Sequence, residues 1–230
     1  RLTPGMIEAL AATDRRTITL APECGLPGAR RMIGKSLADE TLLDAVAQLC
    51  RAGIVTIKLY FMVGLPDLTP RDESAAIAAL AGKVSHVLRT ESRTGSPATR
   101  LAVSVAGFVP KPWTPYQWKS MRSEGDLKIA IKDLERRLKP MRGVTFLHDV
   151  PKWSRIEGLL ARGDRRLAHL LLAVHECEGN WSRALRRVNL NPAFYVDRRR
   201  DHDEILPWDH LQSGEDKAAL IAACGMDTPR

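Results

Sequence analysis

Residues 55–66, VTIKLYFMVGLP, decide the fold of this chain. Apolar side chains occupy every second position from Val55 to Val63. Between them stand residues that are polar or amphipathic, namely Thr56, Lys58, Tyr60 and Met62. Because successive side chains of a strand point to opposite faces, this pattern predicts a strand with one apolar and one polar face. Gly64-Leu65-Pro66 predicts the turn that ends it.

Similar signals flank this strand. We predict further strands at 17–21 and 101–106, with helices at 39–51 and 70–88 between the three strands. Thr69 can cap the second helix, Pro70 suits its first position, and Asp72 completes a capping box. We predict a polar loop at 89–99. Strands that alternate with helices at this spacing indicate parallel βα units and an α/β fold.

The three strands share a division of faces. On the first strand, Ile18 and Leu20 lie opposite a face made of Thr17, Thr19, Ala21 and Glu23. On the third, small residues at 102, 104 and 106 oppose Leu101, Val103 and Val105. A closed barrel fills its interior with large branched side chains, so this polar and small face predicts an incomplete barrel with a roomy cavity. The alternative is an edge-rich sheet with one solvated face.

The pattern of alternating strands and helices ends after Gly107. Residues 108–118 predict an irregular loop rich in proline and aromatic residues. The remaining pattern is mostly helical, with expected helices at 126–139, 153–162, 165–177, 181–188 and 215–223 and a short strand at 143–147. We therefore expect half of a barrel at 1–122 and a mostly helical extension at 123–230.

Composition narrows the class of protein. The 230 residues are 44% hydrophobic and 27% charged, which excludes a disordered chain. No apolar run approaches the roughly 20 residues of a membrane span, and no signal peptide precedes 17–21, so we expect a cytoplasmic protein without membrane contact. A net charge of +8 favours a nucleic-acid partner or, alternatively, solvated basic helix faces. The four cysteines, at 24, 50, 177 and 224, match no metal-ligand spacing, so we expect reduced thiols and no metal.

Six segments in order carry a family resemblance. KLYFMVGLP, preceded by APECG and followed by SVAGFVPKPWTPYQW, resembles the radical S-adenosylmethionine superfamily. FLHDVPKWS, LLARGDRR and ILPWDHL resemble its uncharacterised branch, whose longer members carry an N-terminal domain of the cobalamin-binding type. The resemblance implies S-adenosylmethionine and a four-iron four-sulfur cluster as cofactors. The CxxxCxxC motif that holds the cluster is absent from this chain, so we expect no cluster on it.

The resemblance also implies a place for the chain in the parent enzyme. It matches strands four to six of a six-stranded partial barrel and the extension that follows. We expect a truncated chain that is inactive alone; the alternative is a natural protein that lost the cluster half. The parent would cleave S-adenosylmethionine reductively and carry out radical chemistry on an unknown substrate. A basic module that binds nucleic acid or modifies RNA is the alternative function.

Site residues follow from the same match. Glu23 corresponds to a strand-end acid that contacts S-adenosylmethionine, although it could also be a loop cap. Met62 and Gly64 correspond to the segment beside the adenine, unless Gly64 only forms a tight turn. The implied cofactor-binding set is Glu23, Gly25, Met62, Gly64 and Pro66. The implied substrate-cavity set is Lys58, Tyr60, Ser104 and Lys111, in which Glu23 or the ligand would pair with Lys58.

Other candidates are weaker. The resemblance assigns no cluster ligand to Cys24, and related members carry His where this chain has Trp113. His148-Asp149 and Trp208-Asp209-His210 invite a metal or acid–base interpretation, against the simpler one of structural hydrogen bonds. Catalytic residues stay unassigned. The strand at 17–21 would have an open edge, so we expect self-association through it, unless a C-terminal helix covers that edge.

Overall fold

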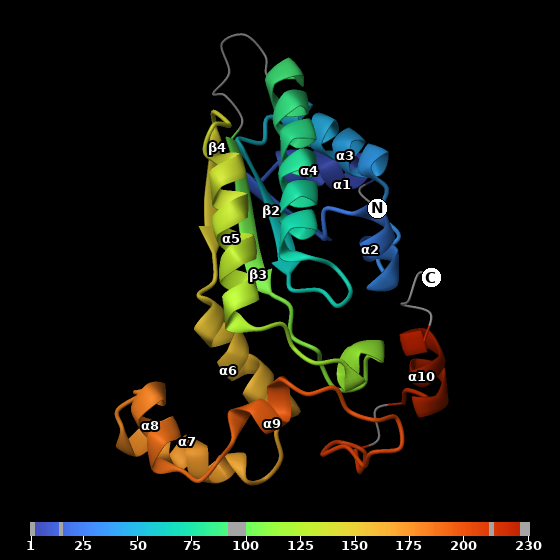
Figure 1. Ribbon diagram of the computed structural model, residues 1–230. Coiled ribbons are helices and arrows are strands. Elements are labelled where there is room, and N and C mark those ends of the chain that lie inside the picture. The colour runs from blue at the N-terminus through green and yellow to red at the C-terminus, as the bar shows by residue number, and fades with distance from the viewer. Residues whose placement is uncertain (1–2, 14–15, 92–99, 212–213, 226–230) are drawn as a thin grey trace. The chain divides into compact units, whose positions relative to one another are not determined.

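The computed structural model describes residues 3–13, 16–91, 100–211 and 214–225. Its fold belongs to the α/β class (Figure 1). Four parallel strands stand in chain order, β1-β2-β3-β4. They are β1 (Thr17–Glu23), β2 (Thr56–Val63), β3 (Arg100–Gly107) and β4 (Val144–His148). The predicted α/β class and the four predicted strands are confirmed.

Helices connect the strands and continue beyond them. Those before β4 are α1 (Pro4–Ala11), α2 (Pro27–Met32), α3 (Asp39–Arg51), α4 (Pro70–Glu91), the 3₁₀ helix η1 (Pro115–Trp118) and α5 (Glu124–Leu138). Those after β4 are α6 (Pro151–Arg162), α7 (Leu167–Glu176), α8 (Trp181–Arg187), α9 (Pro192–Val196) and α10 (Lys217–Gly225). No helix within the described ranges is long and apolar enough to cross a membrane.

The central strand β2 behaves as its alternation predicts. Ile57, Leu59, Phe61 and Val63 are buried, whereas the intervening side chains are half-buried or exposed. β3 repeats the pattern with Leu101, Val103 and Val105 buried. The apolar face lies under α4, which contacts both strands, and α3 packs beside α4 (Figure 1). Burial of this face in one layer of helices leaves the opposite face of the sheet less covered.

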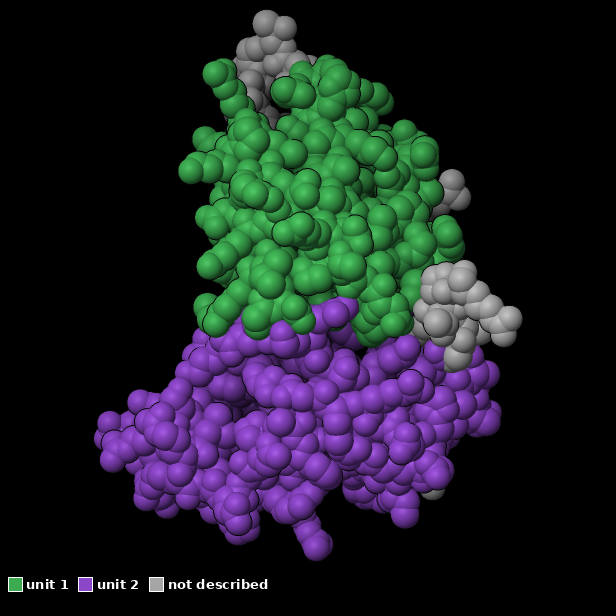
Figure 2. Space-filling model, in the orientation of Figure 1, with its two compact units in different colours: residues 1–107, 125–150 green, residues 108–124, 151–230 purple. Residues whose placement is uncertain are grey.

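The chain divides into two compact units (Figure 2). The first unit comprises residues 1–107 and 125–150, and the second comprises 108–124 and 151–230. This division differs from the expected boundary at 122/123. β4 pairs with β3, so β4 and the preceding α5 belong with the sheet, whereas the aromatic segment 108–124 belongs with the helical unit. The predicted loop at 89–99 begins inside α4, and its remainder, 92–99, lies outside the described residues.

The second unit has its own aromatic core. Trp118 of η1 is fully buried and packs with four residues from the end of the chain, Leu206, Trp208, Leu220 and Cys224. Gln117 supports this core, because its side-chain oxygen accepts hydrogen bonds from Trp208 Nε1 at 2.7 Å and from Trp113 N at 3.0 Å. The segment 108–118 is therefore an anchored part of the second unit, with a single helical turn at its end.

Candidate functional site

The carboxyl end of β1 departs from regular strand geometry. The pairing with β2 shifts between Leu20 and Glu23, so the simple alternation predicted for this strand does not reach Glu23. Glu23 has a φ of 66°, a left-handed conformation that a non-glycine residue rarely adopts. Its Oε1 accepts a hydrogen bond from Lys35 Nζ at 2.8 Å. Glu23 is thus a strained, half-buried carboxylate at the edge where parallel sheets usually bind ligands.

The loop after Glu23 is held by a buried arginine. Arg30 of α2 donates to the carbonyl oxygens of Cys24 at 2.9 Å, Gly25 at 3.2 Å and Leu37 at 2.6 Å. Its guanidinium also pairs with Asp39 at the start of α3. Burial opposes ionisation of Asp39, but hydrogen bonds from Lys83 and Arg30 outweigh it and lower the Asp39 pKa. These contacts fix the backbone that positions Glu23.

Close packing accounts for the two residues that follow Glu23. A Cβ atom at Gly25 would clash with the backbone of Ala76 and Ile77 on α4, so this position requires glycine for packing. Cys24 is buried, and burial raises the pKa of its thiol. Cys24 therefore packs here as a small buried side chain with little access to solvent.

The turn after β2 is held by a buried carboxylate. Glu73 of α4 is 2% exposed and accepts hydrogen bonds from Gly64 N at 2.9 Å and Leu65 N at 2.8 Å. Gly64 has a φ of 91°, which suits glycine. Because the Gly64 and Leu65 amides are already bonded to Glu73, they shape the turn rather than offer donors to a ligand. Pro66, the last residue of the predicted cofactor set, follows this turn and is half-buried.

The less covered face of the sheet brings most of the predicted cavity residues together. Tyr60 of β2 pairs in register with Ser104 of β3, and Met62 pairs with Ala106. Tyr60 is 41% exposed. The Lys58 ammonium lies 4.7 Å from the centre of the Tyr60 ring, a cation–π distance. Glu23, one of the two partners expected for Lys58, pairs with Lys35, and the other expected partner is the ligand.

Lys111, the remaining residue of the predicted substrate-cavity set, belongs to the second unit, where it pairs with Glu157 of α6. His148 ends β4 and is exposed, with Nδ1 3.0 Å from its neighbour's carbonyl oxygen, a structural contact.

Two further predicted candidates also lie in the second unit. Asp209 has a structural role, because its Oδ2 accepts from Leu206 N and Lys217 Nζ. Trp113 adopts a left-handed φ of 54° beside Gln117.

The sequence patterns missed three residues of this site: Arg30, Lys35 and Glu73. Each acts across a gap of five to twelve residues in the chain, and none falls in a recognised motif. The acidic first turn of α4 was the only signal for Glu73, and that signal predicts only a favourable contact with the helix dipole.

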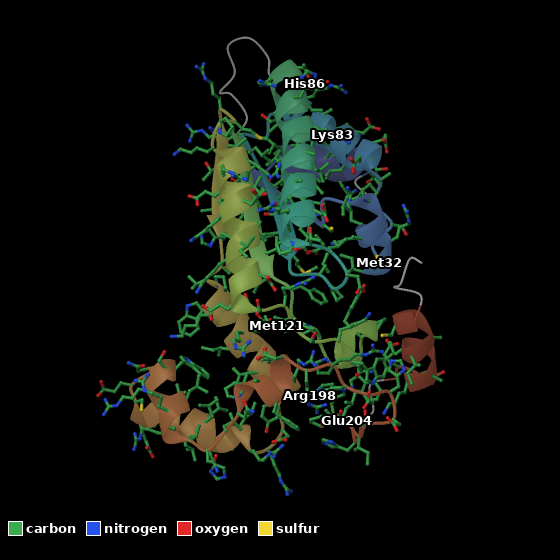
Figure 3. All side chains as sticks on the ribbon, in the orientation of Figure 1. Met32, Lys83, His86, Met121, Arg198 and Glu204 are labelled. Carbon is green, nitrogen blue, oxygen red and sulfur yellow. The ribbon has the colours of Figure 1, made fainter. Side chains whose placement is uncertain are left out.

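The described residues also line two grooves. One has a volume of about 610 Å³ and is lined by α2, the start of α3 and Lys83, which Figure 3 labels. Lys83 bonds Asp39 at 2.7 Å across it. The other, of about 490 Å³, lies between α5 and β4. Neither is lined by a predicted site residue. Among the described residues, no three His, Cys, Asp or Glu side chains are placed to hold a metal ion.

Comparison with known proteins gives one relative. The chain is 31% identical over 158 residues to an uncharacterized protein of Methanocaldococcus jannaschii. The alignment includes 68% of this chain and 32% of the relative, so the chain spans about a third of the length of the protein it matches. No family model matches the chain, and no solved structure matches it.

Proposed function

We propose that the chain is the C-terminal half of a radical S-adenosylmethionine enzyme, with strands β1 to β3 as the last strands of a partial barrel. The observation that carries this proposal is the strand order. In a doubly wound sheet the order reverses and the ligand binds at the reversal. Here four described strands follow one another without reversal, which favours a segment of a barrel.

The open face of the sheet supports the same proposal. In a partial barrel this face lines the cavity, and ligands bind toward the carboxyl ends of the strands. Tyr60, Met62 and Ser104 lie on this face, and Glu23 lies at the carboxyl end of β1. The M. jannaschii relative is about three times as long as the aligned stretch, which leaves length in that protein for further barrel strands.

The residues of this chain fit part of the implied cofactor set. The strained Glu23 carboxylate would accept hydrogen bonds from the ammonium or ribose hydroxyls of S-adenosylmethionine, with Lys35 setting its orientation. Met62 would contact the ligand beside the turn that Glu73 holds. S-adenosylmethionine supplies the radical chemistry when bound, whereas the protein binds it, orients it and excludes water. The buried cysteines do not fit an iron–sulfur cluster, because no three of them lie close in sequence.

Calorimetry with S-adenosylmethionine tests the proposal. We expect weak binding, with a Kd above about 100 μM, because a partial pocket loses several kcal/mol. Glu23→Ala should abolish the binding, whereas Glu40→Ala, an exposed acid on α3, should leave it unchanged. Glu23→Gly should also abolish binding but raise stability by about 1 kcal/mol, because glycine tolerates the left-handed φ. Binding that survives both Glu23 variants would contradict this site.

A nucleic-acid interface is the second candidate. Its support is the exposure of Arg183 and Arg186 on α8, together with Arg165 and Arg199. The structure weakens it elsewhere, because other arginines of the basic runs are buried or bonded to acids, as in the Arg198–Glu204 pair. A steep fall in RNA affinity with salt would favour this function.

A further inference from the structure

The second unit buries two arginines completely. Arg162 at the end of α6 is 0% exposed, and Arg200 is 1% exposed. Arg162 Nε donates to Tyr195 O at 3.0 Å, and Arg200 Nη2 approaches the same oxygen at 3.4 Å. Arg200 Nη2 also donates to Arg162 O at 3.0 Å. The two guanidinium groups therefore meet at one carbonyl oxygen.

Neither arginine has an ion-pair partner among the residues that the structure describes. The acids nearby are already engaged: Glu204 binds Arg198 with both carboxylate oxygens, and Asp164 pairs with Arg166 (Figure 3 labels the first pair). Burial, followed by repulsion from Arg200, lowers the pKa of Arg162 to about 10. Burial also lowers the pKa of Arg200. Glu204 partly offsets the charge of both arginines, but two buried cations without a direct ion pair favour the binding of a further anion.

The arginines and the residues linked to them by contacts carry several unpaired donors. Within the described structure, Arg162 Nη2, Arg200 Nε and Arg200 Nη1 are buried without a hydrogen-bond partner. The same holds for Trp118 Nε1, Gln117 Nε2 and Trp113 Nε1. Their residues are in direct contact: Arg200 N donates to Trp118 O at 2.8 Å, and the Arg200 guanidinium lies 5.0 Å from the centre of the Trp208 ring. Trp208 in turn donates to Gln117.

The balance of donors and acceptors identifies the chemistry of the missing partner. Gln117 Oε1 accepts two hydrogen bonds, which fixes its Nε2 as a donor. Six unpaired atoms in the cluster are thus donors, against Asp209 Oδ1 as an acceptor and His202 Nε2, which can be either. Water would need acceptors for its own protons and would leave the charge uncompensated. The unprotonated oxygens of an oxyanion accept hydrogen bonds, and its negative charge neutralises the arginines.

We propose that the second unit binds a phosphate-type oxyanion at Arg162 and Arg200, with the side-chain N–H groups of Trp118 and Gln117 as further donors. A tetrahedral oxyanion has four oxygens, which suits several donors that come from different directions. The anion is free phosphate or the phosphate group of a larger ligand. This site lies in the second unit and does not depend on the function proposed for the sheet.

The test uses the full chain, titrated with inorganic phosphate by calorimetry and thermal unfolding, with chloride at equal ionic strength as the reference. We expect saturable phosphate binding. At a hundredfold excess over Kd, the Tm should rise by roughly 5–10 °C above the chloride value. Glycerol phosphate separates the two sources: tighter binding than inorganic phosphate assigns an ester, and weaker binding assigns the free ion.

Arg200→Met and Arg199→Met form a matched pair, because Arg199 is exposed and adjacent. We expect Arg199→Met to bind phosphate as the unmodified chain does. Arg200→Met should lose both the binding and the phosphate-specific rise in Tm. Equal Tm values in phosphate and chloride for the unmodified chain would overturn the proposal. An unchanged phosphate response in Arg200→Met would also overturn it.

A second variant covers the case in which Arg200→Met does not fold. Trp118→Phe keeps both arginines but removes one donor, and it should weaken phosphate binding about fivefold. Unchanged phosphate affinity in this variant would count against the donor set proposed here.

Discussion

Replacing Glu73 by alanine removes the carboxylate that holds the turn after β2. Its oxygens accept from the Gly64 and Leu65 amides at 2.8–3.0 Å. A buried N–H that loses its acceptor costs about 1–3 kcal/mol, so two of them cost about 4 kcal/mol. We expect Glu73→Ala to destabilise the first unit by about this amount. Glu73→Gln keeps one acceptor oxygen and should cost about 2 kcal/mol.

Hydrogen exchange is the most direct assay, because it reports on the two amides themselves. We expect both amides to be protected in the unmodified chain and to exchange much faster in Glu73→Ala. Urea unfolding measures the global free energy alongside. Glu40→Ala, an exposed acid in the first turn of α3, is the control and should change stability by less than about 0.5 kcal/mol.

The reasoning fails if Glu73→Ala costs less than about 1 kcal/mol while the Gly64 and Leu65 amides stay protected. That result would mean that the turn keeps its shape without the carboxylate. The role assigned to Glu73, as the residue that presents the carboxyl end of β2, would then be wrong.

Two other predictions concern the same unit. Asp133 of α5 bonds Ser74, Arg137 and Arg136, which lowers its pKa to about 2. Because this folded-state value lies below the ordinary 3.8, the stabilisation is complete above about pH 4 and is lost as pH falls toward 2. Asp133→Asn should therefore cost about 2 kcal/mol at pH 7 by urea unfolding and almost nothing near pH 2. The edge of β1 that does not face β2 should pair two copies of the chain, and Thr19→Lys should convert this dimer to a monomer in light scattering. If the unmodified chain is monomeric at high concentration, edge pairing is excluded.

The sheet was predictable because its signals are local. Alternation in 55–63 defines the buried face of β2, and apolar spacing in 39–51 defines α3 with the bounds that the structure has. Helix α2 was missed because PGARRM is six residues long and has no apolar period. The shift before Glu23 was missed because a bulge adds one residue without changing the composition of the strand.

The site was less predictable because its geometry depends on contacts between distant residues. Arg30 and Glu73 are charged and nearly fully buried, whereas composition predicts charged residues at the surface. Only the carbonyl oxygens and amides that they bond explain their burial. The family resemblance groups Lys111 with Lys58, and the structure assigns Lys111 to the second unit and Lys58 to the first. Residue type and spacing cannot report such a division.

The interleaved course of the chain has a consequence for biosynthesis. Segment 108–124 leaves the ribosome before α5 and β4, yet Trp118 is completed as a core residue only by Leu206 and Trp208. At roughly 5–20 residues per second, translation of the intervening stretch takes on the order of 5–20 s. During that interval the Trp118 side chain lacks its packing partners, whereas the sheet can already form. The aromatic core of the second unit can therefore form only after Leu206 and Trp208 have been synthesised, later than the strands of the sheet.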